Sequence, residues 1–279
     1  MIACFAPSPA LAPYVIDYCV YDISAAARNG APAKVTTFPD TISVACFLWG
    51  DPVQAEHKHN KTDSARSAVS GFQTYRFDIE GHGRQAGVAA RFTAWGARCF
   101  FPESAQAFVD VRVDYRDLFQ PSRVEALEDE LHELNNDRAR ARCVDAFLLA
   151  HLRPQAMDHA VRAAALGIWR QGGLGSIAAL AESTNLSVRT LERRFLSVVG
   201  VGPKKFARVV RLQHALQHYN RIGSWTDTAF ATGYSDQSHL IRECQAMLGE
   251  SPEVLFAKPS CELTQGFESA KQSAQGMQT

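Results

Sequence analysis

Two stretches of related sequence decide the fold of the C-terminal part of this 279-residue chain. Residues 176–203 read SIAALAESTNLSVRTLERRFLSVVGVGP, and residues 225–252 read WTDTAFATGYSDQSHLIRECQAMLGESP. Both stretches end in a Gly-x-x-Pro sequence, at Gly200 to Pro203 and at Gly249 to Pro252. In the first halves of the two stretches, matching residues are separated by a constant number of positions. In the second halves, this separation is one position longer. They therefore represent one helical unit that occurs twice.

Each copy predicts a short helix, a tight turn and a longer second helix, which together form a helix-turn-helix unit. Ser176 and Ser187 are the predicted N-caps of the first copy, and Ser235 is the predicted cap of the second helix in the second copy, because serine hydroxyls accept hydrogen bonds from helix N-termini. Helical spacing identifies the residues that we expect to point inward: Val188, Leu191, Phe195 and Val198 in the first copy, and Leu240, Cys244 and Met247 in the second.

Polar side chains remain on the outer face of each second helix. They are Arg189, Thr190, Arg193 and Arg194 in the first copy, and Gln237, Ser238, Arg242 and Gln245 in the second. Arginine can bond both major-groove acceptors of guanine, and glutamine can both donate to and accept from adenine. Residues 204–219 predict one linking helix, which could hold two reading helices roughly 34 Å apart, one turn of DNA.

From Ser176 to Pro252 the chain resembles the AraC/XylS family of bacterial transcription regulators. The resemblance includes the run Ala-x-x-Thr-Gly-Tyr-Ser-Asp-Gln-Ser-His-Leu-x-Arg from Ala229 to Arg242. It implies that the second helix of each unit enters the major groove of double-stranded DNA. The implied base-reading residues are Arg189, Thr190, Arg193, Gln237, Ser238, His239 and Arg242, and the expected phosphate contacts are Ser187, Arg194, Lys204, Lys205 and Ser235.

Two positions depart from the family pattern. Cys244 stands where the family usually carries Phe, which removes a large buried volume and predicts a looser second unit. Trp225 opens the second copy in place of the usual Ile, and its ring can fill the same core.

The charge of the chain is unevenly distributed. Residues 170–258 hold eleven Lys and Arg against seven Asp and Glu, although the whole chain has a formal net charge of zero. This modest excess predicts a few phosphate contacts and a matching salt dependence. A generic, strongly basic nucleic-acid binder is excluded.

The N-terminal part, residues 1–120, has the sequence pattern of a β-rich domain. Short apolar and β-branched runs alternate there with Gly, Pro, Asp and Asn; they are Tyr14–Tyr21, Thr41–Trp49, Phe72–Ile79, Gly87–Phe92 and Ala107–Val113. Its aromatic residues either line a ligand pocket or fill the core; they are Phe47, Trp49, Phe72, Trp95, Phe100 and Phe101.

Residues 121–171 predict helices, beginning with a capping box formed by Ser122 and Glu125. Their leucine stripes could form a dimer interface or cover the open face of the β-domain. Three glycines at 172, 173 and 175 mark the border of the DNA-binding domain, predicted over residues 172–258. Residues 259–279 are rich in Ser, Gln and Gly, which predicts a disordered tail.

We therefore expect an α+β protein of two domains, a β-rich sensor-like domain with a helical connector and an all-α domain with two helix-turn-helix units joined by a linking helix. This layout is similar to AraC-type regulators. Pro9–Tyr18, Phe38–Asp40 and Gly87–Phe101 resemble the N-terminal domain of one AraC-type subgroup. The resemblance implies that this domain binds a small-molecule effector or mediates homodimer formation.

Alternative chemistries have weaker support in the sequence. Seven scattered cysteines without a Cys-x-x-Cys pair predict neither a zinc site nor a disulfide framework, and most are expected to be small buried hydrophobes, with a redox-sensing thiol as the alternative. His57, His59 and Asp63 come close to the spacing of a cupin metal motif, but the segment is so polar that solvated histidines on a loop are the preferred interpretation. No metal or other cofactor is expected.

No hydrolase elbow, phosphate loop or zinc-spaced histidine motif occurs, so no catalytic residue is predicted. An enzyme or a metal-binding N-terminal domain fused to a DNA-binding module is the alternative function, and a protein-binding adaptor is a third. The sequence thus predicts a sequence-specific transcription regulator that is cytoplasmic, binds double-stranded DNA and is expected to contact RNA polymerase. No segment is apolar enough to predict a membrane span.

Overall fold

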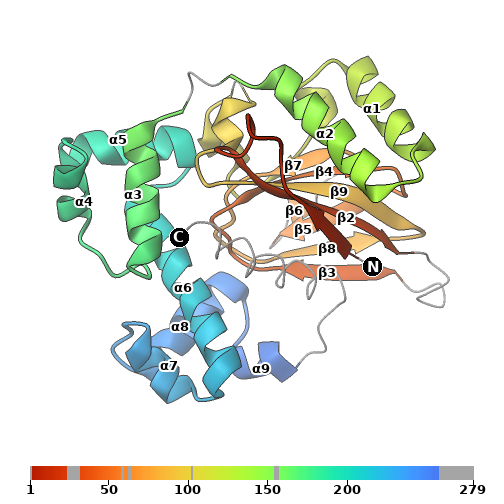
Figure 1. Ribbon diagram of the computed structural model, residues 1–279. Helices are drawn as coiled ribbons and strands as arrows, with labels where there is room; N and C mark the ends of the chain where they lie inside the picture. The colour runs from red at the N-terminus through yellow and green to blue at the C-terminus, as the bar shows by residue number, and fades with distance from the viewer. Residues whose placement is uncertain are drawn as a thin grey trace.

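The computed structural model describes residues 2–23, 32–57, 60–61, 65–101, 103–153 and 157–257. Its N-terminal part is built of strands, and its C-terminal part is built of helices (Figure 1). The strands are β1 (Ile2–Phe5), β2 (Val15–Ile23), β3 (Ala33–Thr37), β4 (Ser43–Leu48), β5 (Val53–His57), β6 (Asn60–Lys61), β7 (Ala68–Ser70), β8 (Phe77–Gly81), β9 (Gln85–Phe92) and β10 (Arg112–Asp114).

The helices begin after the last strand. They are α1 (Pro121–Glu133), α2 (Asp137–His151), α3 (His159–Arg170), α4 (Ile177–Ser183), α5 (Val188–Val199), α6 (Pro203–Ile222), α7 (Trp225–Ala231), α8 (Gln237–Leu248) and α9 (Pro252–Ala257). Three short 3-10 helices lie among the last strands; they are η2 (Ala97–Cys99), η3 (Ala105–Phe108) and η4 (Tyr115–Asp117). The expected α+β architecture is therefore confirmed.

The strands form two antiparallel sheets. One has the order β1-β2-β9-β4-β7-β10, and the other has the order β3-β8-β5-β6. Successive residues of β2 point to opposite faces of the larger sheet: Tyr18 and Val20 face a core shared with α1 and α2, whereas Cys19 and Tyr21 face the smaller sheet. Both faces of the larger sheet are therefore covered, one by helices and the other by the smaller sheet. For this reason all eight residues of the central strand β9 are buried.

Helices α1 and α2 lie across one face of the larger sheet (Figure 1). Leu127, Leu131 and Leu148 are buried against this sheet, so the leucine stripes of α1 and α2 pack into the core of this chain. The predicted capping box is wrong, because α1 begins at Pro121 and its N-cap, Gln120, makes no side-chain cap bond. Proline has the backbone angle of a first helical residue, so the helix begins before Ser122 can cap it.

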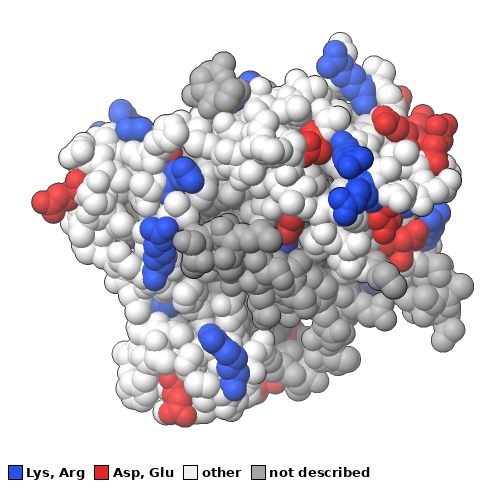
Figure 2. All heavy atoms as spheres, in the orientation of Figure 1, with Lys and Arg blue, Asp and Glu red and all other residues white. Residues whose placement is uncertain are grey.

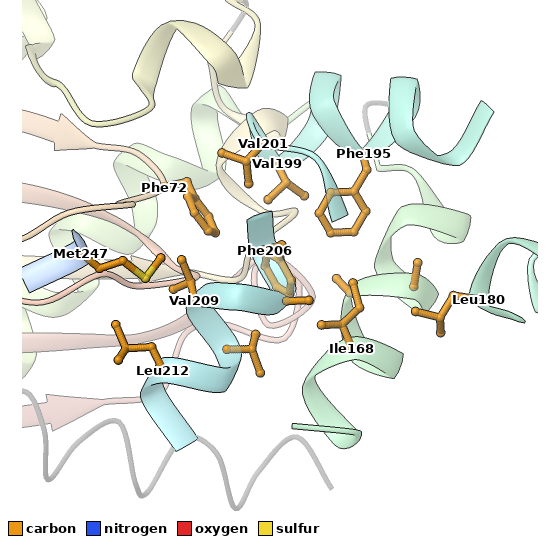
Figure 3. Close-up of a cluster of buried hydrophobic side chains, with 14 of the residues drawn as sticks. Phe72, Ile168, Leu180, Phe195, Val199, Val201, Phe206, Val209, Leu212 and Met247 are labelled. Atoms are coloured by element: carbon orange, nitrogen blue, oxygen red, sulfur yellow. The ribbon is translucent and has the colours of Figure 1, made fainter. Parts of the chain in front are cut away.

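Helix α3 contributes to a different core. Its residues Val161, Ala165 and Ile168 are buried with side chains from the helix-turn-helix units (Figure 3). The helical region thus divides between the two parts of the protein, with α1 and α2 on the sheet and α3 on the C-terminal helices. Glycines at 172 and 173, both with positive φ, end α3 as the sequence predicts.

All five expected strand regions contain strand residues, but two of the predicted runs are only partly extended. Ala107–Val113 begins inside η3, and the strand β10 starts at Arg112. Phe72–Ile79 becomes a strand only at Phe77, because residues 72–76 leave the sheet and contact the C-terminal helices. The six aromatic residues named as either pocket or core are all buried in the two main cores. No helix among the described residues is both long and apolar enough to cross a membrane.

Adjacent leucines of α2 allow a matched test of this packing. Leu148 is 0% exposed and Leu149 is 45% exposed. We expect Leu148→Ala to lower the free energy of unfolding by about 2 to 5 kcal/mol, because it leaves a cavity beneath the sheet. Leu149→Ala should change it by less than about 0.5 kcal/mol. Urea unfolding followed by circular dichroism measures both, and equal losses would contradict this placement of α2.

Candidate DNA-binding surface

The two helix-turn-helix units have the same local geometry. In the first unit Ser176 and Ser187 cap α4 and α5, accepting hydrogen bonds from backbone N–H groups of those helices. The turn between α4 and α5 contains Asn185 at φ 55°, and its counterpart between α7 and α8 contains Gly233 at φ 74°. Both residues adopt the left-handed backbone conformation that Asn and Gly tolerate best. The matched turns explain why these positions correspond in the two sequences.

The units also end alike. Gly200 and Gly249 close α5 and α8 in left-handed conformations, at φ 91° and 77°. Pro203 and Pro252 then occupy the first positions of α6 and α9. Glycine after a helix and proline at the start of the next are the residues these backbone angles favour. The Gly-x-x-Pro signature is thus a helix stop followed by a helix start.

The cap of α8 differs from the sequence prediction. Asp236, not Ser235, is the N-cap, and its carboxylate accepts a hydrogen bond from the backbone N–H of His239 at 2.8 Å. That bond, with one from the Ser235 hydroxyl, lowers the pKa of Asp236 below its usual value. The shift of one residue at this point in the repeat places an aspartate, the stronger acceptor, where the first unit has Ser187.

The predicted base-reading residues of α5 lie on its outer side. Arg189 and Arg193 are exposed, and within the described residues neither has an ion-pair partner. Thr190 is half-buried, and its hydroxyl lies 2.9 Å from that of Ser187. The inward stripe agrees with prediction at Leu191, Phe195 and Val198. Val188 is an exception at 39% exposed, because it occupies the first helical position, at the edge of the unit.

The corresponding face of α8 is partly held by local contacts. Ser238 and Arg242 are exposed. The Gln237 side-chain oxygen accepts a hydrogen bond from Thr226 at 3.0 Å, and the His239 ring packs edge-on against Tyr234 with ring centroids 5.2 Å apart. Leu240, Cys244 and Met247 are buried as expected. Both units therefore present exposed arginine on the second helix.

Two of the predicted phosphate contacts have partners within the chain. Both oxygens of Asp158, the N-cap of α3, accept hydrogen bonds of 2.6 Å from Arg194. Lys205 lies over the ring of Tyr75 at 5.9 Å. Lys204 is exposed in the first turn of α6, and Ser187 and Ser235 are exposed beside the starts of α5 and α8. Figure 2 shows Lys and Arg as separate groups over the C-terminal helices, in keeping with their modest charge excess.

Helix α6 connects the units, which lie toward its opposite ends (Figure 1). Its 20 residues correspond to about 30 Å of helix. Arg208 donates two hydrogen bonds of 2.9 Å to Glu243 of α8, and Tyr219 stacks on Trp225 of α7 with ring centroids 3.5 Å apart. The Trp225 ring therefore fills the core, as its size predicts. These contacts attach the second unit to the connector.

The N-terminal domain contacts both units directly. Phe72 enters the helical core and lies 5.8 Å from Phe206, ring centroid to ring centroid (Figure 3). Arg76 forms an ion pair of 2.8 Å with Glu250, and its backbone N–H donates to the carbonyl of Met247. On the first unit, η3 packs against α5 so closely that a Cβ on Gly200 would meet the carbonyl of Ala105 at 2.6 Å. Nothing in the sequence pattern around residues 72–76 signalled this contact.

Further polar contacts cross the same junction. The Gln213 amide of α6 donates to Asp40 at 2.8 Å, and the Trp169 indole of α3 donates to Thr41 at 3.2 Å. Beside these contacts lies a crevice with walls from both domains. Apolar residues that line it include Phe72, Phe101, Phe108, Val198 and Val199.

Most of the possible metal-binding motif lies outside the described residues. His59 and Asp63 are not among them, and His57 is the last residue of β5. Elsewhere in the described ranges, no group of three or more His, Cys, Asp or Glu side chains is arranged to hold a metal ion.

Comparison with known proteins finds a family model for each of two separate parts of the chain. A family model described as a helix-turn-helix domain matches residues 180–258, and one described as a domain of unknown function matches residues 3–114. Among curated proteins, none matches the chain.

Two solved structures are similar to this chain. A probable AraC family transcriptional regulator from Rhodopseudomonas palustris is 30% identical, over 37% of this chain and 100% of that one, with a TM-score of 0.32. ToxT from Vibrio cholerae is 11% identical, over 86% of this chain and 97% of that one, with a TM-score of 0.48.

The Asp158–Arg194 pair gives a pH-dependent test of how α3 is attached to α5. Burial opposes ionisation of Asp158, but hydrogen bonds from Arg194 and from the backbone of α3 outweigh it and hold the pKa below its usual value. A carboxyl with a lowered folded-state pKa stabilises the protein above its unfolded pKa of about 3.9, and this contribution disappears as the pH falls through the folded value. Asp158→Asn keeps an N-cap residue but removes the charge. We expect it to lower the urea midpoint at pH 7, with the difference from wild type shrinking as the pH falls below the unfolded pKa and vanishing below the folded one. A difference that persists at low pH would mean that the charge is not the cause.

Proposed function

Since this chain belongs to the AraC/XylS family of DNA-binding transcription regulators, we propose that α5 and α8 are its two base-reading helices and that the N-terminal domain controls how they are held. The observation that carries this proposal is the duplicated unit, with arginines exposed on the second helix of each copy and one straight helix between the copies. A monomer built in this way reads two neighbouring segments of one face of the duplex.

The proposed base contacts are made from the exposed faces. On α5 they come from Arg189, Thr190 and Arg193. On α8 they come from Gln237, Ser238, His239 and Arg242, with the positions of Gln237 and His239 set by their contacts to Thr226 and Tyr234. Side chains that are held before binding lose less entropy on the DNA, which favours their use for recognition.

The proposed phosphate contacts are Ser187, Ser235, Lys204 and Lys205. Serines beside helix N-termini add hydroxyl donors where the backbone N–H groups already favour anions. Arg194 was expected in this group, but its charge is neutralised by Asp158. We propose that it joins α3 to α5 instead.

The N-terminal domain is proposed to bind a small-molecule effector. We place this site at the crevice lined by Phe72, Phe101, Phe108, Val198 and Val199, which has a volume of about 20 Å³ in this structure, so an apolar ligand would have to widen it and would then touch both domains at once. A ligand changes the arrangement of the helices only if it binds one arrangement better than another, and a site at the junction meets that condition. A cytoplasmic location, homodimer formation and contact with RNA polymerase are further expectations for a regulator of this family.

Arginine and lysine substitutions distinguish base reading from phosphate contact. The cognate site is first located by nuclease footprinting on DNA upstream of the gene of this protein and its neighbours. We then expect Arg193→Ala and Arg242→Ala to cost about 1 to 3 kcal/mol on that site and to relax base preference at one position each. Lys204→Ala should weaken specific and random DNA alike and reduce the salt slope by about 1. Fluorescence anisotropy at several salt concentrations measures all of these effects.

Arg221→Ala is the control, because Arg221 is exposed near the far end of α6 and has no proposed contact with DNA. Equal losses on cognate and random DNA for Arg193→Ala would contradict base reading by α5. A footprint with only one protected segment would contradict the two-helix arrangement.

The ion pair between Arg76 and Glu250 tests the proposed control by the N-terminal domain. Arg76→Ala and Glu250→Ala should each weaken binding to the two-segment site, because the second unit is then held less firmly relative to the first. Binding to a DNA that carries only one segment should change little. The double variant should lose less than the sum of the two single losses, since both remove the same contact. Strictly additive losses, or no loss on the two-segment site, would mean that the ion pair between these residues does not influence DNA binding.

A further inference from the structure

Two cysteines that are 15 residues apart in sequence face each other across neighbouring strands. Cys4 of β1 pairs with Cys19 of β2 in the antiparallel register, and their Sγ atoms lie 2.6 Å apart. Directly opposed residues in antiparallel strands have Cα atoms about 4.5 to 5.5 Å apart, which is within the range that a disulfide spans. These two thiols can therefore be bridged without moving the backbone. The sequence offered a redox-sensing thiol only as an alternative, and it did not predict that Cys4 and Cys19 meet.

The two thiols differ in their access to solvent. Cys4 is exposed on β1, the edge strand of the larger sheet, whereas Cys19 is 0% exposed between the two sheets. A small oxidant can reach Cys4 from solvent, and Cys19 lies directly behind it. This is the arrangement of an attacking thiol and a resolving thiol.

A hydrogen bond within the pair favours reaction at Cys4. This bond, from the Cys19 thiol, lowers the pKa of Cys4 and outweighs burial and the charge of Asp17, which both raise it; the charge of Arg91 lowers it further. The Cys19 thiol lies 3.7 Å from Oδ1 of Asp17, whose carboxylate is held by Arg91 in a salt bridge. The hydrogen bond to Cys4, burial and the charge of Asp17 together raise the pKa of Cys19, so Cys4 is the thiol that reacts first.

Other described cysteines lack these features. Burial raises the pKa of Cys46, and it raises those of Cys99, Cys143 and Cys244 to about 11, 12 and 12. A thiol that remains protonated reacts slowly with peroxides. Cys99 and Cys244 are buried and fit the predicted role of small buried hydrophobes, whereas Cys46 and Cys143 are half-buried.

We propose that Cys4 and Cys19 form a reversible dithiol–disulfide site that is oxidised by a hydroperoxide. The Cys4 thiolate attacks the distal oxygen of the peroxide, the O–O bond breaks, and an alcohol, or water from hydrogen peroxide, leaves. Cys4 becomes a sulfenic acid. Cys19 sulfur then attacks Cys4 sulfur, the S–OH bond breaks and water leaves as the disulfide forms. Two thiols lose two electrons and two protons, and the peroxide gains them; a dithiol reductant restores the thiols by exchange.

The sequence makes this site convenient to measure. Residues 1–28 contain Cys4 and Cys19 and have no Lys or Arg before Arg28, so one tryptic peptide carries both thiols. The full-length protein is reduced, freed of reductant and exposed to hydrogen peroxide. It is then alkylated with N-ethylmaleimide under denaturing conditions and digested. The peptide should lose both alkylation sites and about 2 Da relative to its unalkylated dithiol form, and dithiothreitol should restore both sites.

Single variants identify the role of each thiol. In Cys19→Ser, oxidation should stop at the sulfenic acid of Cys4, which a 1,3-dione reagent captures. In Cys4→Ser, Cys19 should react at least about tenfold more slowly than in the wild type. Cys143→Ser is the control and should oxidise like the wild type, and circular dichroism checks that each variant folds. Retention of both alkylation sites in the wild type, or a disulfide that joins either residue to another cysteine, would overturn the proposal.

Discussion

Burial of helix α6 is the constraint on which the rest of this structure depends. Phe206, Val209 and Leu212 are fully buried and belong to one core with side chains from α3, α5 and α8 (Figure 3). Because that core continues from the first helix-turn-helix unit to the second, neither unit can rotate without exposing apolar surface, at roughly 25 cal/mol for each Å². Polar contacts then fix the second unit on this helix. The ion pair between Arg208 and Glu243 is an example. The two reading helices are thus parts of one packed body.

The same core also connects the N-terminal domain to the helix-turn-helix units. Phe72 comes from a segment that leaves the β-rich domain and enters the helical core, and Arg76 follows it to the end of α8. At the other unit, η3 lies against the end of α5. A change in the N-terminal domain therefore reaches both units through short contacts, without a long path through the molecule. A small ligand bound in the crevice at this junction would contact both domains and would thereby influence how the two units are arranged.

The pair of thiols lies in a separate place, on the edge of the larger sheet. A bridge between Cys4 and Cys19 would tie the edge strand to β2, which also carries Asp17 and Tyr18. Tyr18 donates a hydrogen bond to Asp145 of α2 at 2.8 Å, so β2 connects this edge to the helices that cover the sheet. The proposed thiol site and the proposed ligand site thus lie in different parts of the N-terminal domain.

The sequence by itself determined the helix-turn-helix units, because their signals are local. A cap, a helical stripe, a left-handed turn residue and a Gly-x-x-Pro ending each act within a few residues, and the repeat shows them twice. It also indicated the β-rich texture of the first domain and the outward arginines at 189, 193 and 242. Local signals were less reliable at two helix starts. Asp236 rather than its neighbour Ser235 caps α8, and the predicted box at Ser122 is absent because Pro121 starts α1.

Tertiary structure alone decided which distant residues meet. Arg194 has the pattern of a surface cation until Asp158 is placed beside it, and residues 72–76 look like a strand until their contacts with α6 and α8 are known. Strand pairing likewise brings Cys4 to Cys19, although no short motif joins them. Such contacts depend on register and on the packing of whole elements, which are set by the sum of many long-range interactions. For that reason the reading helices could be predicted from the sequence, whereas their coupling to the first domain and the thiol pair could not.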